Sequence, residues 1–417
     1  MKKLLSKVVL LSIVIIASIF SNANSQWSQT SNGMGNNKTV ISFDSLGSNF
    51  FAGTYEAGLY ISTNNGANWS VTSVNATQIN ALASNGSTIF AGAEDIGGTG
   101  GVYVSSNNGT NWTKTAAGYR IFSIACKDGF TIAGTYASSG IILSSNNGAN
   151  WVTTSLTTGG VLAIKTMGTR IFAGVSNTGA STSNGVYIST NNGANWTLSS
   201  LSNRVVTSFT VSGSNIFAGT QEGGVYLSTD NGATWSQTTS IGGNSVNALA
   251  SIGSNIFAGV YVSGFYHSSN NGLSWTQKNE GFTVGTTQTY IYALTIKNNS
   301  IFAGTLNNSV WQRSLSTVTS NVKQVSSTVP AAFLLNQNYP NPFNPTTKIN
   351  FSIPKSSNTI LRVYNTNGME VETLVNQNLQ AGTYSVDFGN SYLSSGIYFY
   401  TLTAGDFRDT KRMMLVK

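Results

Sequence analysis

The stretch that decides the fold is Ser62-Thr-Asn-Asn-Gly-Ala-Asn-Trp69, an eight-residue box that recurs along the chain. Further copies follow at intervals of 39 to 45 residues and end at Trp112, Trp151, Trp196, Trp235 and Trp275. A period of about 40 residues is typical of repeat architectures in which each copy is one structural unit. The box therefore marks the successive units of an array.

Each unit carries a second landmark, the tetrapeptide Ile-Phe-Ala-Gly or a close variant. It occurs at residues 50–53, 89–92, 131–134, 171–174, 216–219, 256–259 and 301–304. Around the two landmarks, every unit shows four short apolar or alternating runs separated by turn residues, which predicts four antiparallel strands. A unit of about 40 residues with four strands is typical of one propeller blade. The sequence therefore predicts a seven-bladed β-propeller over residues 26–313.

The seventh unit lacks a box, and the start of the chain supplies what it lacks. Trp27-Ser-Gln-Thr30 repeats Trp235-Ser-Gln-Thr238, which follows the box in the fifth unit. We expect the N-terminal strand to become the outer strand of blade seven. Such pairing closes the ring and removes an exposed sheet edge.

The two ends of the chain carry different segments. Residues 1–25 are expected to be a secretory signal peptide, with Lys2 and Lys3 before the apolar run Val8–Phe20 and a small-residue exit. No segment of the mature chain is apolar enough to predict a membrane span. Residues 314–332, rich in Ser, Thr and Val, are expected to be a linker.

Residues 333–417 are expected to form a second, smaller β domain. Alternating runs succeed one another there, and Asn367-Gly368 is a strong hairpin signal. A small Ig-like β-sandwich of about 85 residues is the structure that this pattern favours. The predicted fold is thus all-β throughout.

Composition excludes several kinds of function. Charged residues make up 8% of the chain, and the net charge of +8 includes three leader lysines and no basic cluster, which argues against nucleic-acid binding. One cysteine, Cys126, and one histidine, His267, exclude an intramolecular disulfide and any site that needs two residues of either type. No metal and no cofactor is expected. We expect the mature protein to be a monomer.

The box resembles the Asp-box, or BNR repeat, whose consensus in sialidase-like propellers is S-x-D-x-G-x-x-W. Asp230 alone keeps the acid, and Asn stands at the equivalent position of the other copies. Asn can form the same side-chain-to-backbone hydrogen bond, so we expect the box to keep its structural role. The resemblance implies that a ligand binds on the opposite face of the propeller.

The C-terminal segment resembles the type A sorting domain of the type IX secretion system. The motifs that carry this resemblance are Asn338–Phe343, Val363–Gly368, Gly382–Tyr384, Ser395–Tyr398 and Lys411–Lys417. It implies that residues 333–417 engage the type IX machinery, that this domain is later removed, and that the protein is secreted or displayed on the outer cell surface.

The chemistry of sialidases does not transfer to this chain, although the repeat resembles theirs. Sialidases need an arginine triad, and the predicted propeller contains Arg120, Arg170, Arg204 and Arg313. Arg170 lies in a hairpin that should point to the other face, and Arg313 follows the last strand. We therefore assign no catalytic residue.

Candidate ligand-binding residues lie in the loops of the face opposite the boxes. Tyr55, Tyr136 and Tyr261 share one repeat position after the second strand, and Phe282 and Tyr290 extend the same face. The full candidate set is Tyr55, Glu56, Glu94, Asp95, Arg120, Tyr136, Arg204, Glu222 and Tyr261. The alternative explanation is that these tyrosines fill gaps between blades and the charges are solvated.

Two functions remain open on this pattern. The favoured one is a non-catalytic binding or interaction module for an unknown glycan or protein ligand. The alternative is a carbohydrate-active enzyme, because Glu56 and either Glu94 or Asp95 could supply the two carboxylates that glycoside hydrolysis requires. Single propellers with this repeat also resemble photosystem assembly factors, a role against which the sorting domain argues.

Overall fold

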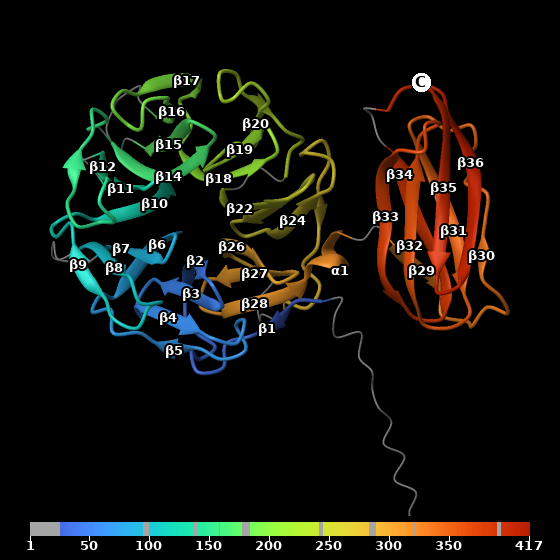
Figure 1. The fold of residues 1–417 in the computed structure, drawn as a ribbon, viewed down its shortest axis with the longest axis horizontal. Helices are drawn as coiled ribbons and strands as arrows, with labels where there is room; N and C mark the ends of the chain where they lie inside the picture. The colour runs from blue at the N-terminus through green and yellow to red at the C-terminus, as the bar shows by residue number, and fades with distance from the viewer. Residues whose placement is uncertain are drawn as a thin grey trace, which may run out of the picture.

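A computed structural model describes residues 26–417 except 95–99, 137–139, 158, 177–183, 242–244, 283–288, 320–321 and 390–392. The predicted signal peptide lies outside the described residues. Within them, the chain forms nine four-stranded antiparallel sheets and one short helix. A ring of sheets and a separate sandwich are visible in Figure 1.

Seven of the sheets described lie between Ser28 and Ser314, one for each predicted unit. The first three consist of β2 (Val40–Leu46), β3 (Asn49–Thr54), β4 (Leu59–Ser62) and β5 (Ser70–Val71); β6 (Gln78–Asn85), β7 (Thr88–Glu94), β8 (Gly101–Ser105) and β9 (Thr113–Thr115); and β10 (Ile121–Lys127), β11 (Phe130–Thr135), β12 (Ile141–Ser144) and β13 (Val152–Thr153). The next two consist of β14 (Gly160–Met167), β15 (Arg170–Ser176), β16 (Gly185–Ser189) and β17 (Thr197–Ser202); and β18 (Val206–Ser212), β19 (Asn215–Thr220), β20 (Gly224–Ser228) and β21 (Ser236–Gln237). The last two consist of β22 (Val246–Ile252), β23 (Asn255–Val260), β24 (Gly264–Ser268) and β25 (Thr276–Gln277); and β26 (Ile291–Lys297), β27 (Ser300–Thr305), β28 (Ser309–Ser314) and β1 (Ser28–Gln29).

The glycine of each Ile-Phe-Ala-Gly landmark lies where one sheet meets the next. A Cβ on Gly53 would come within 2.8 Å of the Ile79 side chain in the second sheet. The same relation links the last sheet to the first, because a Cβ on Gly304 would come within 2.8 Å of the Val40 side chain. No side chain fits at these positions, so the landmark glycine sets the spacing between sheets. The contacts run around a closed ring (Figure 1).

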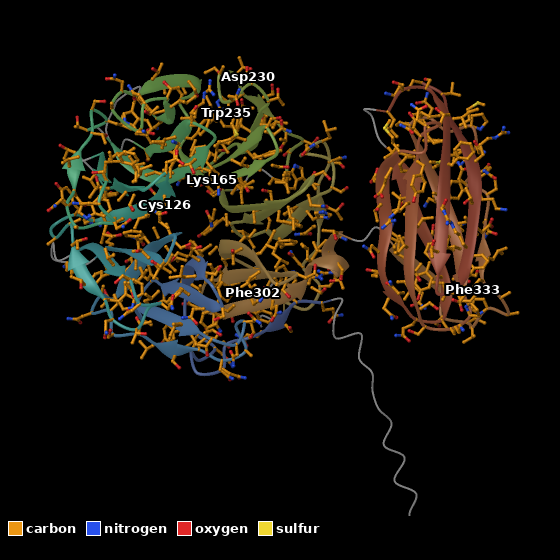
Figure 2. All side chains as sticks on the ribbon, viewed as in Figure 1. Cys126, Lys165, Asp230, Trp235, Phe302 and Phe333 are labelled. Atoms are coloured by element: carbon orange, nitrogen blue, oxygen red, sulfur yellow. The ribbon has the colours of Figure 1, made fainter. Side chains whose placement is uncertain are left out.

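The box folds into the same hydrogen-bonded hairpin in every copy. In the first copy, the Ser62 Oγ accepts the Gly66 N–H (2.8 Å) and the Asn64 Oδ1 accepts the Asn68 N–H (2.8 Å). The carboxylate of Asp230, at the outer edge of the ring in Figure 2, accepts the Thr234 N–H in the same way. Asn and Asp are both acceptors at this position, so the predicted structural role of the box is confirmed.

The N-terminal strand closes the last sheet, as predicted. β1 pairs antiparallel with β28, and Ser28 lies opposite Gln312. Trp27 is buried beside this strand, where its Nε1–H donates to the Lys278 carbonyl (2.9 Å). Its ring stacks on Phe282 with centroids 4.7 Å apart. Phe282 therefore packs inside the closure, and its predicted place on the ligand face is wrong.

The C-terminal sandwich consists of two antiparallel sheets around one apolar core. One sheet contains β29 (Val322–Ser326), β30 (Leu334–Leu335), β31 (Thr346–Ile353) and β34 (Gly382–Gly389); the other contains β32 (Ser357–Tyr364), β33 (Glu370–Leu379), β35 (Gly396–Ala404) and β36 (Phe407–Leu415). Both sheets bury large residues such as Phe351 and Tyr400. The predicted hairpin at Asn367-Gly368 joins β32 to β33, and Gly368 has a positive φ of 75°.

The predicted linker over residues 314–332 contains structure, which corrects that assignment. The helix α1 (Leu315–Thr319) buries Leu315 and Val318 against the propeller, and β29 pairs with β34 at the edge of the sandwich. An edge strand is held by backbone hydrogen bonds on one side and needs little apolar surface. A polar segment rich in Ser and Thr can therefore form one without an apolar signal in its sequence.

Candidate functional site on the loop face

A pocket of about 500 Å³ opens between the first and last sheets, which we call the seam pocket. Three loops line it: the one between β1 and β2, the one between β3 and β4, and the one between β27 and β28. The lining residues are Asn37, Lys38, Thr39, Tyr55, Glu56, Ala57, Leu306 and Asn307. Its volume falls within the range of small-molecule sites. Of the predicted candidates, Tyr55 and Glu56 lie here.

Hydrogen bonds across the seam hold the walls of this pocket in place. The Ser309 N–H donates to the Lys38 carbonyl (2.8 Å), and the Lys38 N–H donates to the Ser309 Oγ (3.0 Å). Beside them, the Thr39 Oγ1 and the Asn307 Oδ1 are 3.1 Å apart. Residues near both ends of the propeller sequence thus meet in one rigid wall.

Several polar groups of the seam pocket are left open. Within the described residues, the Lys38 ammonium, the Glu56 carboxylate and the Tyr55 hydroxyl have no hydrogen-bond or ion-pair partner. Glu56 is exposed, and the Tyr55 side chain is 46% exposed. A cation, an anion and an aromatic ring are therefore all available to a ligand.

A cluster of tyrosines adjoins the pocket on the same face. The rings of Tyr261 and Tyr290 pack edge to face with centroids 4.8 Å apart. Burial raises the pKa of Tyr292, in β26, above its usual value. The nearby hydroxyls of Tyr261, Tyr290 and Tyr55 add to this increase. Tyr292 thus interacts electrostatically with tyrosines of both the first and the sixth sheets.

The sequence did not single out Tyr292, although a signal was present. It occupies the second position of the run Ile291-Tyr-Ala-Leu294, where Asn80 and Asn247 stand in other units. Comparison of this position across the repeats would have identified Tyr292 as an aromatic residue where other units have asparagine.

The candidates in the second and third sheets form a separate cluster. Glu94 is 6% exposed and forms a salt bridge with Arg120, and its carboxylate also accepts the side-chain amides of Gln78 (3.2 Å) and Asn80 (3.3 Å). The Arg120 guanidinium lies over the ring of Tyr136, 4.5 Å from its centroid. These residues therefore bind one another at the junction between two sheets. Asp95 lies outside the described residues.

The candidates in the fifth sheet do not line the seam pocket. The Arg204 Nε–H donates to the Tyr226 hydroxyl (3.3 Å), and Glu222 is exposed in the loop between β19 and β20. The structure thus groups the candidates in three places: the seam pocket with its tyrosines, the Glu94–Arg120–Tyr136 cluster and the fifth sheet.

Two half-buried charged residues lie on the innermost strands, Asp44 on β2 and Lys165 on β14. Burial raises the pKa of Asp44, and burial lowers the pKa of Lys165 while the charge of Asp44 opposes that decrease. Lys165 lies toward the centre of the ring in Figure 2. Sequence reasoning missed both, because their proximity depends on closure of the ring.

The single histidine and the single cysteine are buried or half-buried in strands. His267 is buried in β24 and stacks on Phe257, and burial together with the charges of Lys278 and Arg313 lowers its pKa to about 3. Burial raises the pKa of the Cys126 thiol to about 11, so the thiolate form is scarce at neutral pH.

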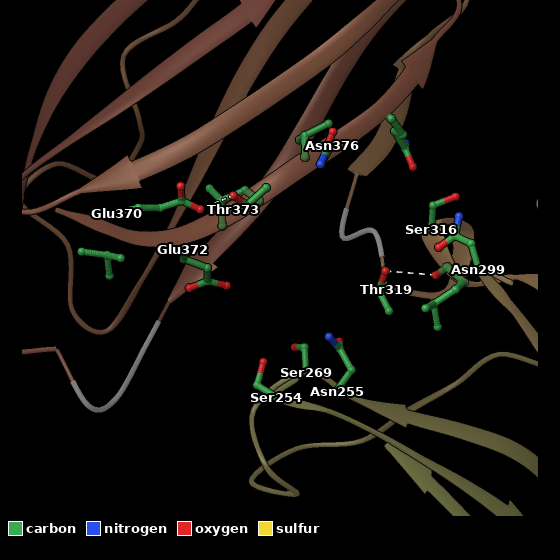
Figure 3. A pocket seen from close by; sticks show the side chains of 15 residues that line it. Ser254, Asn255, Ser269, Asn299, Ser316, Thr319, Glu370, Glu372, Thr373 and Asn376 are labelled. Carbon is green, nitrogen blue, oxygen red and sulfur yellow. Dashed lines mark hydrogen bonds between the residues drawn. The ribbon is translucent and has the colours of Figure 1, made fainter. Parts of the chain in front are cut away.

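A second cleft, of about 610 Å³, contains none of the predicted candidates. Its lining comes from β33 between Glu370 and Gln377, from α1, and from turns of the propeller such as the one at Ser254 and Asn255. Figure 3 shows the polar side chains that line it. Because both the propeller and the sandwich contribute to it, this cleft depends on the presence of the sandwich.

Two families match the chain. Residues 337–417 match the family described as secretion system C-terminal sorting domain, and residues 226–237 match the family described as BNR/Asp-box repeat. The chain joins Asp-box repeats to a secretion sorting domain. Both resemblances inferred from sequence are thereby confirmed. No curated protein matches the chain.

Solved structures with similar folds are β-propellers. YCF48 from Cyanidioschyzon merolae is 14% identical, with a TM-score of 0.55 over 69% of this chain and 98% of that one. PorZ, a surface component of the type IX secretion system of Porphyromonas gingivalis, is 12% identical, with a TM-score of 0.55 over 90% of this chain and 59% of that one. AFV00434, an ancestral GH74 enzyme, is 17% identical, with a TM-score of 0.54 over 93% of this chain and 63% of that one. At these identities the likeness concerns the fold alone.

The sorting domain indicates export by the type IX secretion system. The protein is therefore secreted or displayed at the cell surface, and the type IX machinery is its partner during export. In the part of the chain that the structure describes, no helix has the length and apolarity to cross a membrane.

Proposed function

We propose that the exported propeller is a non-catalytic binding module for a glycan or a protein ligand, and that it acts as a monomer. The observation that carries this proposal is the seam pocket, where open polar groups and an exposed tyrosine meet in a hollow of about 500 Å³. Rigid walls and open side chains favour recognition, because little ordering is needed when a ligand binds. We also propose that residues 26–313 are the functional part and that residues 333–417 serve export.

The carboxylates of this face support binding more than hydrolysis. Glycoside hydrolases place two carboxyl groups about 5 to 10 Å apart on either side of the scissile bond. Among the described residues that line the seam pocket, Glu56 is the one carboxylate. Glu94, its expected partner, is buried against Arg120 and accepts two amides as well. A carboxylate held in this way is poorly placed to transfer a proton to a sugar.

Binding and turnover can be measured on the same protein, the chain from Gln26 to Lys417. We expect it to retain a ligand from an array of glycans or peptides and to leave chromogenic glycosides unhydrolysed. Hydrolysis that is lost in Glu56→Gln would contradict this proposal and support the enzyme alternative. Failure to retain any glycan or peptide would contradict the binding function.

A further inference from the structure

We propose that the seam pocket, together with Tyr261 and Tyr292, binds an uncharged oligosaccharide. This inference rests on the proposed binding function and adds the place and the chemical class of the ligand. The supporting features are the charges of the pocket, its aromatic rings, its hydrogen-bonding groups and its position at the closure of the ring.

In the described part of the chain, the seam pocket is lined by one positively and one negatively charged side chain, so their formal charges cancel. Among the described residues that line it, Lys38 and Glu56 are the charged side chains, which are of opposite sign, and none is an arginine. Sites that select carboxylate or phosphate commonly use the paired N–H donors of arginine. The two arginines among the predicted candidates are engaged elsewhere, Arg120 with Glu94 and Arg204 with Tyr226. The pocket therefore has no net preference for an anionic or a cationic chain.

Exposed tyrosine rings lie in the pocket and on a neighbouring sheet. Tyr55 is 46% exposed and Tyr261 is 41% exposed, and Tyr261 packs edge to face on Tyr290 with centroids 4.8 Å apart. Both tyrosines contribute electrostatically to the raised pKa of Tyr292. A tyrosine ring offers an apolar face and a polar tip at a small entropic cost, which suits a ligand with C–H surfaces edged by hydroxyls. Exposed rings on more than one sheet favour a chain of sugars over a single sugar.

The remaining groups in the pocket fit hydroxyls better than a peptide. A sugar hydroxyl both donates and accepts hydrogen bonds, and Asn37, Asn307, Lys38 and Glu56 supply both kinds of partner. Peptides are usually held by an open sheet edge or by apolar grooves. Among the described residues that line the pocket, Ala57 and Leu306 are the aliphatic ones.

The position of the pocket links binding to ring closure. The wall at residues 37–39 belongs to the loop between the closing strand β1 and β2, and Thr39 contacts Asn307 across the seam. A ligand that binds both sides of the seam must therefore stabilise the closed ring, by an amount that grows with its concentration.

The test is isothermal titration calorimetry on the chain from Gln26 to Lys417. The probes are four neutral hexasaccharides, namely cellohexaose, xylohexaose, mannohexaose and maltohexaose, with hexagalacturonate as the anionic comparison. We expect at least one neutral probe to bind. Tyr55→Ala should weaken its binding at least tenfold and Glu56→Gln at least threefold, and the bound probe should raise the Tm.

Matched variants control for general effects on the fold. Tyr136→Ala changes the same repeat position in the third sheet, and Glu222→Gln changes an exposed loop carboxylate in the fifth. Neither residue lines the seam pocket, so both variants should bind within twofold of the unaltered chain. Thermal unfolding of each variant shows whether a loss of affinity accompanies a loss of structure.

The outcomes separate this inference from the proposed function. Neutral binding that survives both Tyr55→Ala and Glu56→Gln would refute the seam pocket while leaving a binding function. Binding of hexagalacturonate alone would refute an uncharged ligand, and retention of peptides alone would refute a sugar. If neither glycans nor peptides are retained, the proposed function fails as well.

Discussion

The two faces of the ring are built from the same repeat, yet their polar groups are satisfied in different ways. On the box face, the polar side chains of each hairpin accept hydrogen bonds from backbone N–H groups of the same eight residues, as Ser62 and Asn64 do in the first copy. On the loop face, Lys38, Glu56 and Tyr55 have no such partners among the described residues. In the boxes, repetition thus accompanies hydrogen bonding within each hairpin, whereas these polar side chains of the seam pocket are left without such partners in the described part of the chain.

The largest expected effect distinguishes the tryptophan beside the closing strand from the tryptophans of the boxes. Trp27 is 3% exposed and packs against Phe265 and Phe282, so Trp27→Ala should lower the free energy of unfolding by about 3–5 kcal/mol. Trp112→Ala, in a half-buried box position, should cost about 2 kcal/mol. Denaturant unfolding measures both. Equal losses would mean that closure is no more important than any single box.

The next effect tests whether the box is a packing element as well as a turn. Gly109 has a φ of +83°, and a Cβ there would come 2.5 Å from the ring of Phe51 in the preceding sheet. Gly109→Ala should cost about 2–4 kcal/mol, from backbone strain and overpacking together. Gly86→Ala, with a φ of +60° and nothing within 4 Å, should cost about 1 kcal/mol. Similar losses in both variants would show that packing against the neighbouring sheet adds nothing.

A smaller effect concerns the one unit with a histidine in its third strand. The folded pKa of His267 is about 3, below the value of about 6.5 in an unfolded chain, so the unfolded state binds a proton first as the pH falls. The stability of the fold should therefore decrease below pH 6.5 by about 1.4 kcal/mol per pH unit from this group, or about 2 kcal/mol at pH 5.

His267→Leu, the residue type at Leu227 in the fifth sheet, should remove this part of the acid sensitivity. The measurement is the free energy of unfolding at pH 7 and at pH 5 for both chains. An unchanged difference between the two pH values would show that His267 is protonated in the folded protein.

The smallest effect concerns the one acidic box. Hydrogen bonds from the Thr234 hydroxyl and backbone N–H lower the pKa of Asp230 to about 2. Its stabilising contribution is present above the unfolded pKa and is lost as the pH falls through about 2. The Tm difference between the natural chain and Asp230→Asn should therefore shrink between pH 4 and pH 2. A constant difference would mean that the charge of this box is irrelevant.

The sequence predicted best what depends on neighbours along the chain. The box hairpin could be predicted because its bonds join residues at most four positions apart, and closure could be predicted because Trp27-Ser-Gln-Thr30 repeats a later segment. The Glu94–Arg120 salt bridge and the proximity of Tyr292 to Tyr261 depend instead on how separate sheets meet. Of the candidate site, only Tyr55 and Glu56 could be placed together from sequence, since they are adjacent.

The errors have physical causes of the same kind. Phe282 was expected on the surface because it lies in a long loop, but the closure leaves a gap beside Trp27 that an aromatic ring fills. β29 was missed because an edge strand can form from backbone pairing with little apolar content. Tertiary contacts determine both the packing of Phe282 and the formation of β29, and such contacts leave no periodic pattern in the sequence.

The box hairpin also bears on how the protein ages outside the cell. Every box contains an Asn-Gly bond, the kind at which the glycine nitrogen can attack the asparagine side chain and release ammonia. That nitrogen must first lose its proton. In each hairpin the proton is held in a buried hydrogen bond to the box serine, at 2.8 Å for Gly66 and 2.9 Å for Gly109. The serine of the repeat therefore slows deamidation at the very bonds that the turn requires, and an exported protein keeps its asparagines longer.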